Sequence, residues 1–387
     1  MLAVVNLLYE KMSIFIYFKI YMSDYLKEQI ITYMGNKRKL LYKIEEIIQI
    51  IEEKEGRSLH IGDGFAGSGV VSRLFKKYAK TLYTNDIADY SETLNKCFLS
   101  NINEQEHHII CEYIETANKH ANEKTTIFNK PYISGTWSPK GEITEKSRVY
   151  FTEENGERID IIRNYIDTLP DIYKPYVLAP LIIECSIHNN TSGHFSAFYK
   201  NEQGKGQYGG KNHIDLKRIT QPITLKMPLY HNSKCKVVVN KMNTNEWVKT
   251  LPKLDLVYYD PPYNKHPYSI YYFLLNIINN WESIDIPDTN RGQPLNWEKS
   301  NYNSSCYAEK SLTDLIKNTN STYILLSYNN GGIIKLDKLD EILSTYGEVT
   351  KIPVEHKTYN KLKGISEYKK KEEKEKIKEF FWLLKKN

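Results

Sequence analysis

A short apolar run at residues 254–259 ends at Asp260, Pro261 and Pro262, and this junction constrains the fold more than any other feature of the chain. The β-branched and aromatic residues of the run are typical of a buried strand. Two consecutive prolines end a strand because they lack the backbone N–H groups of its ladder. Asp260 and Tyr263 therefore follow the carboxyl end of a predicted strand, the edge at which ligands bind in open α/β sheets.

The tetrapeptide Asp260-Pro261-Pro262-Tyr263 is chemically suited to an aromatic amine. The prolines stiffen the turn, so that a carboxylate, carbonyl oxygens and one aromatic ring project from a fixed frame. Asp260 and the carbonyl of Pro261 can each accept one N–H of an exocyclic NH2 group, and Tyr263 can stack on the ring that carries it. A lone Asp-Pro is more often an ordinary turn, but the whole tetrapeptide after an apolar strand favours a site.

A second predicted ligand-binding unit lies at residues 59–78. It has the pattern of a strand, a loop of small residues and a helix, which together bind nucleotide-like ligands. Gly62, Gly64 and Gly67 satisfy G-x-G-x-x-G, which is a weak signal by itself. Because Asp63 would repel a pyrophosphate, the loop favours a ligand with an ammonium group.

Two further stretches place charged groups near this unit. Residues 80–85 form a predicted strand that ends at Asp86, where such folds hold ribose hydroxyls; an ordinary strand-end aspartate is the alternative. Lys37, Arg38 and Lys39 precede an amphipathic helix that runs to about Glu53. Cations at a helix N-terminus oppose its dipole, which favours a ligand such as a carboxylate; a solvated helix start is the alternative.

The middle of the chain predicts an inserted domain. The 387 residues suffice for one large domain with an insertion or for two domains, and the alternation of strand and helix is lost from about residue 100 to 235. Residues 189–210 are polar and glycine-rich, and Lys200, Lys205 and Lys211 are interleaved with aromatic residues. This composition suits phosphate contact and base probing, with a flexible surface loop as the alternative. The net charge of +6 is compatible with nucleic acid but does not establish it.

Composition excludes several other classes of protein. The five cysteines contain no C-x-x-C pair, so neither a zinc site nor a disulfide framework is indicated, and a reducing cytoplasm fits best. Charged residues break the apolar N-terminal stretch, so we expect no membrane span and no signal peptide. We interpret residues 1–22 as a dispensable extension and expect deletion of residues 1–21 to leave the activity intact.

The rest of the chain completes an α/β pattern. Helices are predicted at residues 160–169, 176–187, 270–279, 312–318 and 336–346, and strands at 323–327, 348–354 and 379–384. The last two strands suit an antiparallel hairpin at the end of the sheet. The mixed Lys/Glu run at 367–378 is expected to be a solvated linker or helix.

Taken in order, these pieces resemble the Dam-like adenine-N6 DNA methyltransferase family. The matching motifs are Tyr33-Met34-Gly35-Asn36-Lys37, Asp63-Gly64-Phe65-Ala66-Gly67-Ser68-Gly69, Asn85-Asp86 and Asp260-Pro261-Pro262-Tyr263, and residues 188–210 are similar to the family's DNA-inserting hairpin region. The resemblance implies a mostly parallel, Rossmann-like α/β sheet with an antiparallel C-terminal hairpin. It also implies catalytic segments at 23–105 and 236–387 around a target-recognition domain at 106–235.

The resemblance further implies S-adenosylmethionine as the cofactor and double-stranded DNA as the partner. Lys37 would face the cofactor's carboxylate, Asp63 its ammonium group and Asp86 its ribose. The full set of expected cofactor contacts is Tyr33, Gly35, Asn36, Lys37, Asp63, Phe65, Gly67, Ser68, Gly69 and Asp86. A flipped adenine would meet Asp260, Pro261, Pro262 and Tyr263, and the DNA would meet Asn190, Ser192, His194, Lys200, Lys205 and Lys211.

The resemblance implies neither a bound metal nor a membrane partner. It does imply that the protein is the modification enzyme of a type II restriction-modification system, with a companion restriction endonuclease. One departure from the family concerns the cofactor's adenine. The acid that often holds this ring has no clear counterpart, because Asn240 and Asn243 stand in its place. The contacts of the adenine ring therefore stay open.

Three other functions also stay open. A methyltransferase for another planar amine, such as cytosine N4, RNA adenine or a glutamine side chain, would share the pocket, although relatives of those kinds usually have Ser or Asn at the position of Asp260. A dinucleotide-dependent oxidoreductase would explain the glycine pattern but neither Asp63 nor Asp260. A non-catalytic DNA-binding protein would use the insert alone.

Overall fold

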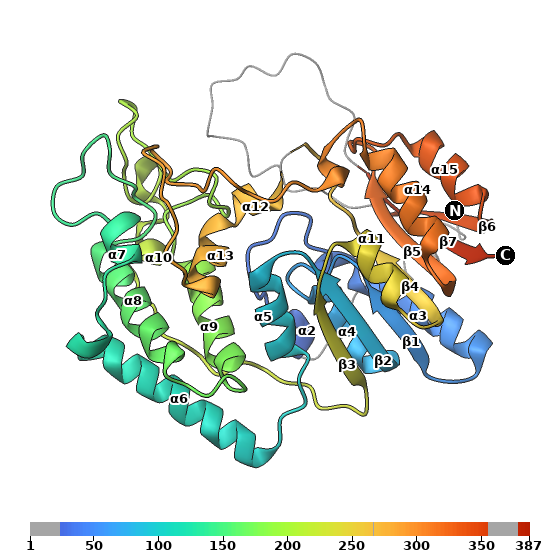
Figure 1. The fold of residues 1–387 in the computed structure, drawn as a ribbon, viewed down its shortest axis with the longest axis horizontal. Coiled ribbons are helices and arrows are strands. Elements are labelled where there is room, and N and C mark those ends of the chain that lie inside the picture. The colour runs from blue at the N-terminus through green and yellow to red at the C-terminus, as the bar shows by residue number, and fades with distance from the viewer. Residues whose placement is uncertain (1–23, 266, 355–377) are drawn as a thin grey trace, which may run out of the picture.

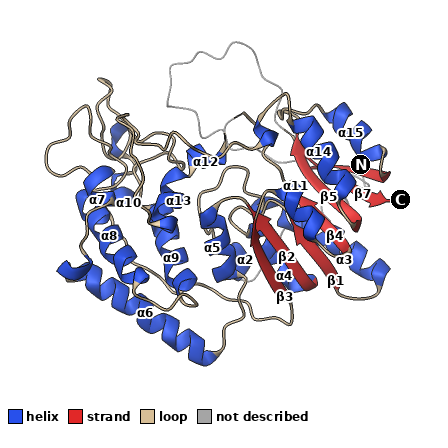
Figure 2. Ribbon diagram, in the orientation of Figure 1, coloured by secondary structure: helices blue, strands red, loops and turns tan. Residues whose placement is uncertain are grey.

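The computed structural model describes residues 24–265, 267–354 and 378–387, and the expectations for residues 1–22 and for most of 367–378 lie outside this part of the chain. A seven-stranded sheet with helices on both faces forms one half of the molecule, and a layer of helices beside it forms the other (Figures 1 and 2). Within the described ranges, no helix is both long enough and apolar enough to cross a bilayer.

The sheet is mostly parallel. Its strands are β1 (Leu59–Asp63), β2 (Ala79–Asp86), β3 (Lys236–Lys241), β4 (Leu254–Tyr259), β5 (Ser321–Asn329), β6 (Gly347–Val354) and β7 (Glu379–Lys386), in the order β3-β2-β1-β4-β5-β7-β6. All neighbouring pairs are parallel except those of β7, which runs antiparallel to both β5 and β6. The Rossmann-like α/β sheet with a C-terminal antiparallel hairpin, expected from the sequence, is confirmed.

The strand order reverses direction between β1 and β4. From β1 the chain moves outward to β2 and β3 and then returns to place β4 on the other side of β1. Such a switch point opens a crevice at the carboxyl ends of the two strands. Asp63 ends β1 and Asp260 follows β4, so both carboxylates stand at this crevice.

Alternate residues of β4 bury against two different layers of helices, as the two-residue period of a strand requires. Leu256 and Tyr258 face a core with α3 (Leu41–Glu55) and α4 (Val70–Tyr78). Val257 and Tyr259 face a core with α11 (Thr244–Trp247), α14 (Ala308–Asn318) and α15 (Leu336–Ser344). Burial on both faces explains why β4 is a continuous apolar run.

The helical layer has its own core. It contains α5 (Asp89–Phe98), α6 (Glu104–Asn122), α7 (Ile133–Thr136), α8 (Glu153–Asp167), α9 (Lys174–Ile187) and α10 (Leu216–Thr220), and α12 (Tyr268–Tyr271) and α13 (Phe273–Asn280) pack into it from the later part of the chain. Shorter helical pieces are α2 (Asp24–Lys27), η1 (Arg38–Leu40), η2 (Thr126–Phe128), η3 (Lys211–His213), η4 (Val248–Thr250) and η5 (Asn301–Asn303). Helices from before and after residues 106–235 thus share a core with the helices of that range.

Several elements were not predicted from the sequence, among them α5, α6 and β3. Helix α6 begins with a capping box between Asn103 and Glu106 and buries Ile110 and Ile114 one turn apart, signals that the sequence contains. Strand β3 is short, partly exposed and at the edge of the sheet, with lysines at both ends, so its apolar pattern is weak.

Candidate active site

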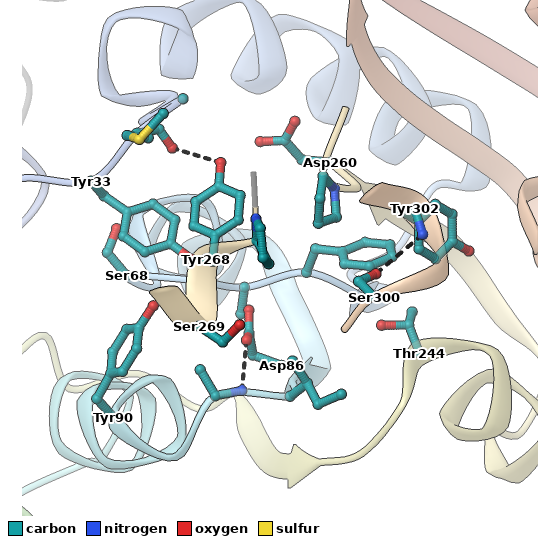
Figure 3. A pocket seen from close by; sticks show the side chains of 18 of the residues that line it. Tyr33, Ser68, Asp86, Tyr90, Thr244, Asp260, Tyr268, Ser269, Ser300 and Tyr302 are labelled. Carbon is teal, nitrogen blue, oxygen red and sulfur yellow. Dashed lines mark hydrogen bonds between the residues drawn. The ribbon is translucent and has the colours of Figure 1, made fainter. Parts of the chain in front are cut away.

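One pocket at the carboxyl edge of β1, β2 and β4 collects motifs that lie far apart in the sequence (Figure 3). Asp260 lies on one side of it and Asp86 on the other, with Tyr33 and Tyr268 at one end and Thr244 and Tyr302 at the opposite end. The predicted site residues that line it are Tyr33, Gly35, Asn36, Lys37, Phe65, Ser68, Asp86, Asp260 and Pro262. Asp63, Gly67, Gly69, Pro261 and Tyr263 are not among its lining residues.

Asp260 forms an ion pair that the sequence did not predict. Its Oδ1 lies 3.0 Å from Nζ of Lys37, and its side chain is 18% exposed. Burial raises the pKa of Asp260 to about 6, although the positive charge of Lys37 acts to lower it. At neutral pH the carboxylate is therefore ionised and is held in place by a cation.

Lys37 is buried between two carboxylates. Its side chain is 3% exposed, and Nζ lies 3.8 Å from Glu379 at the start of β7 and donates a hydrogen bond of 3.2 Å to the carbonyl of Gly35. Burial is the largest single effect and would lower the pKa of Lys37, but Asp260, Tyr263 and Glu379 together outweigh it and raise the pKa above its ordinary value. The expected contact with a cofactor carboxylate stays a prediction, because the partner of Lys37 in this structure is Asp260.

We call residues 260–263 the acceptor corner. Its other members, Pro261, Pro262 and Tyr263, lie around this ion pair. Pro261 is buried and Pro262 lines the pocket. Nζ of Lys37 lies 5.6 Å from the centre of the Tyr263 ring, and the carbonyl of Tyr263 accepts a hydrogen bond from Ile333. In the described part of the chain, no backbone N–H donates to the carbonyl of Pro261. This oxygen and the carboxylate of Asp260 are thus two acceptors on adjacent residues.

The loop after β1 depends on two glycines. Gly67 and Gly69 have φ angles of 52° and 76°, which side chains rarely adopt. A Cβ atom on Gly67 would lie 2.7 Å from the ring of Tyr33, and one on Gly69 would lie 2.6 Å from Oδ1 of Asn95. The loop is therefore fixed closely between the Tyr33 segment and α5.

Asp63 lies at the end of β1 with its side chain inaccessible to solvent. Its Oδ2 accepts a hydrogen bond of 2.6 Å from Ser72 on α4, while its Oδ1 is buried and has no hydrogen-bond partner among the described residues. Burial raises the pKa of Asp63 to about 7, and the hydrogen bond from Ser72 only partly offsets this. An unpaired buried carboxylate oxygen is costly, so a donor group from a ligand would stabilise this atom.

Asp86 lines the pocket and also holds the loop after β1 by hydrogen bonds. Its two oxygens accept hydrogen bonds from the backbone N–H groups of Gly67, at 2.8 Å, and of Ala88, at 3.0 Å. Burial raises the pKa of Asp86, although these hydrogen bonds act to lower it. Each oxygen keeps a second lone pair, so the carboxylate can still accept hydroxyl donors from the pocket.

Three tyrosine rings stack beside the pocket; Tyr33 and Tyr268 line it, and only Tyr33 was expected there. The ring centre of Tyr33 lies 5.1 Å from that of Tyr268 and 5.0 Å from that of Tyr272. Tyr268 and Tyr272 come from α12 and the residue after it, which follow the Asp260–Tyr263 segment in the chain. Their OH groups donate to the backbone carbonyls of Met34 and Thr32, so they attach the segment around Tyr33 to this corner.

A family model described as D12 class N6 adenine-specific DNA methyltransferase matches residues 33–342. The chain belongs to this family. The matched span contains the residues of the glycine loop that line the pocket, together with Asp86 and Asp260. The resemblance found in the sequence motifs is therefore confirmed at the level of the family.

Curated relatives of this methyltransferase are similar over most of the chain. It is 29% identical over 342 residues to modification methylase StsI of Streptococcus sanguinis, covering 83% of this chain and 48% of that protein. It is 27% identical over 342 residues to type II methyltransferase M.NlaIII of Neisseria lactamica, covering 84% and 92%. It is 29% identical over 367 residues to modification methylase LlaI of Lactococcus lactis subsp. lactis, covering 92% and 55%. The chain thus spans about half the length of StsI and LlaI.

The residues expected to meet DNA in this methyltransferase do not all lie at its surface. Asn190 is fully buried, and its amide bonds the carbonyls of Val149 and Gln207, so it holds its own segment in place. Ser192 and Lys200 are exposed.

The other three expected DNA contacts differ in how far they are exposed. His194 is half-buried and bonds Ser196, and burial lowers its pKa. Lys205 is half-buried and lies 3.7 Å from Glu142. The backbone of Lys211 begins η3, and its side chain is outside the described part of the structure. Ser192 and Lys200 are thus the members of the expected set that are most open to a partner.

Proposed function

We propose that this methyltransferase transfers a methyl group from S-adenosylmethionine to N6 of adenine in double-stranded DNA, after the adenine has left the helix. The observation that carries the proposal is the acceptor corner. Asp260, ionised and paired with Lys37 at 3.0 Å, stands in the same pocket as the glycine loop and Asp86. Family membership supports the identity of the target atom.

The acceptor corner makes the N6 amine of the target adenine more nucleophilic. The lone pair of an aromatic amine is delocalised into the ring, so neutral N6 is a poor nucleophile. The Asp260 carboxylate and the Pro261 carbonyl each accept one N–H, which holds the nitrogen in place and localises its lone pair toward the glycine loop. Charged acceptors form the stronger hydrogen bonds, and this is why an ionised Asp260 is needed. Positioning of this kind provides much of the acceleration.

The residues around the loop fit the proposed cofactor. When bound, S-adenosylmethionine supplies a methyl group on a positively charged sulfur. The unpaired Oδ1 of Asp63 suits its ammonium group, the free lone pairs of Asp86 suit its ribose hydroxyls, and Phe65 and Ser68 line the space between. Asn243 and Thr244 also line the pocket, and we propose that they offer polar contacts to the adenine ring of the cofactor.

The target base must be extruded because N6 lies inside the duplex, at a cost of roughly a few kcal/mol. Tyr263 offers a ring for the extruded base, and Ser192, Lys200 and Lys205 offer contacts to the DNA backbone. We further infer that the enzyme acts in the cytoplasm as the modification member of a type II restriction-modification system, with an endonuclease of the same specificity as its partner. The names of the relatives support this role.

The proposal is tested by incubating the protein with methyl-labelled S-adenosylmethionine and duplex DNA of mixed sequence, digesting the DNA, and separating the nucleosides. We expect the label in N6-methyladenine alone. Label in N4-methylcytosine would establish the alternative amine substrate, and label only with RNA would establish an RNA methyltransferase. Failure to bind the cofactor in calorimetry would favour a non-catalytic DNA-binding protein.

A further inference from the structure

A tight turn at residues 289–292 lies outside the inserted domain and presents two side chains to solvent. The N–H of Gly292 donates to the carbonyl of Thr289, at 3.2 Å, and to its Oγ1, at 3.1 Å. Asn290 and Arg291 form the tip between them, and both are exposed. Neither side chain makes a hydrogen bond or ion pair with the part of the protein that the structure describes.

The turn is held rigidly against the helical layer. Arg148 donates to the carbonyls of Pro287 and Thr289, both at 3.0 Å, and the indole N–H of Trp137 donates to the carbonyl of Arg291 at 3.1 Å. A Cβ atom on Gly292 would lie 2.9 Å from Nε of Arg148, so the backbone touches this support directly. A tip fixed in this way loses little conformational entropy when it binds.

The turn also connects the proposed DNA surface with the active pocket. In Figure 1 the orange segment rises from α13 along the helical layer and returns across α12 toward α14. The carbonyl of Arg291 accepts the indole N–H of Trp137, and the carbonyl of Trp137 accepts the backbone N–H of Tyr150 at 3.0 Å. The OH of Tyr150 in turn donates to the carbonyl of Phe195 in the glycine-rich segment. Further along, Glu298 lines the pocket and its carbonyl accepts a hydrogen bond from Ser269.

We propose that the turn 289–292 reads base edges in the major groove, with Asn290 and Arg291 as residues that determine the recognition sequence. An asparagine amide matches the N6 and N7 edge of adenine, and an arginine guanidinium matches O6 and N7 of guanine. The exposed carboxylate of Asp288 beside the tip would repel phosphates, so the turn suits base edges rather than the DNA backbone. The proposal rests on the proposed function and adds a specificity element outside residues 106–235.

The test is a methylation profile on a library of duplexes randomised around one adenine, with wild-type protein and the variants Arg291→Ala, Arg291→Lys and Asn290→Ala. Arg291→Lys keeps the charge but loses the paired donors. We expect each variant to lose discrimination at one base pair by about 5- to 150-fold while the other positions keep their preference. Cofactor affinity in calorimetry should be unchanged. Lys54→Ala, an exposed cation on α3, is the matched control and should keep the wild-type profile.

The possible outcomes separate this proposal from the proposed function. Wild-type profiles in all three tip variants would overturn it. A uniform loss on all sequences in Arg291→Ala that Arg291→Lys restores would also overturn it, because that result indicates a phosphate contact. If the wild-type protein methylates no DNA, the proposed function itself fails, and this inference fails with it.

Discussion

Replacing Lys37 with methionine tests whether the ion pair at the acceptor corner controls the charge of Asp260. Methionine keeps most of the length of the buried side chain and removes its charge. Two unit charges 3.0 Å apart attract by about 5 kcal/mol at an effective dielectric constant of about 20. Because the Asp260 side chain is 18% exposed, solvent screens part of this attraction, and we expect its pKa to rise by about one to three pH units.

The direction of the effect follows from the charges that remain. In the wild-type protein the pKa of Asp260 is about 6, so methyl transfer should fall about tenfold for each pH unit below it. Without Lys37, burial and the nearby Glu379 both favour the neutral acid. With a pKa near 8, only about 9% of Asp260 would be ionised at pH 7, and the rate there would be about tenfold lower.

The assay is single-turnover methyl transfer from pH 5 to 9.5 at saturating cofactor and DNA. We expect the acid limb to move toward higher pH in Lys37→Met and the rate to recover near pH 9 to 10. The exposed neighbour Lys39 provides the matched control, since Lys39→Met should leave the limb near pH 6. If the acid limb of Lys37→Met stays near pH 6, the ion pair does not control the charge of Asp260, and the reasoning is refuted.

The other predictions concern substitutions at single residues of the proposed site and of the glycine loop. Asp260→Ala should abolish transfer while calorimetry still detects cofactor binding. Tyr263→Ala should weaken base capture, followed by fluorescence of 2-aminopurine at the target, more than cofactor affinity. Asp63→Ala should raise the Kd for the cofactor, and an unchanged Kd would remove Asp63 from the cofactor site. Gly64→Ala should lower the free energy of unfolding by about 1–3 kcal/mol in urea titrations, because its Cβ would lie 2.6 Å from the buried ring of Tyr259.

Features that depend on neighbouring residues could be predicted from the sequence. Strand β4, which ends before Asp260, was predicted from the apolar run at 254–259 and the two prolines that follow. Helix α4 begins at Val70, as predicted. The mostly parallel sheet was implied by the family resemblance, and the alternation of strands and helices at both ends of the chain is typical of such a sheet. Helix α6 could have been predicted as well, because its capping box and buried isoleucines are local signals.

Features that depend on residues distant in the sequence could not be predicted. Lys37 was assigned to a ligand because nothing near it in the sequence shows that Asp260 and Glu379 lie within 4 Å of its amine. Glu379 directly follows a run of lysines and glutamates, so nothing in the local sequence distinguished it as a partner of Lys37. Asn190 was expected at the DNA because residues 188–210 resemble the family's DNA-inserting hairpin region, yet its amide satisfies two buried backbone carbonyls.

The most direct test of the central claim is a crystal structure of this methyltransferase with a non-reactive cofactor analogue and a duplex that contains its target. We predict an adenine turned out of the helix, with its N6 within hydrogen-bond distance of both Asp260 and the Pro261 carbonyl, facing the loop at 65–69. A target adenine still stacked in the duplex, or bound with N6 away from Asp260, would contradict the account.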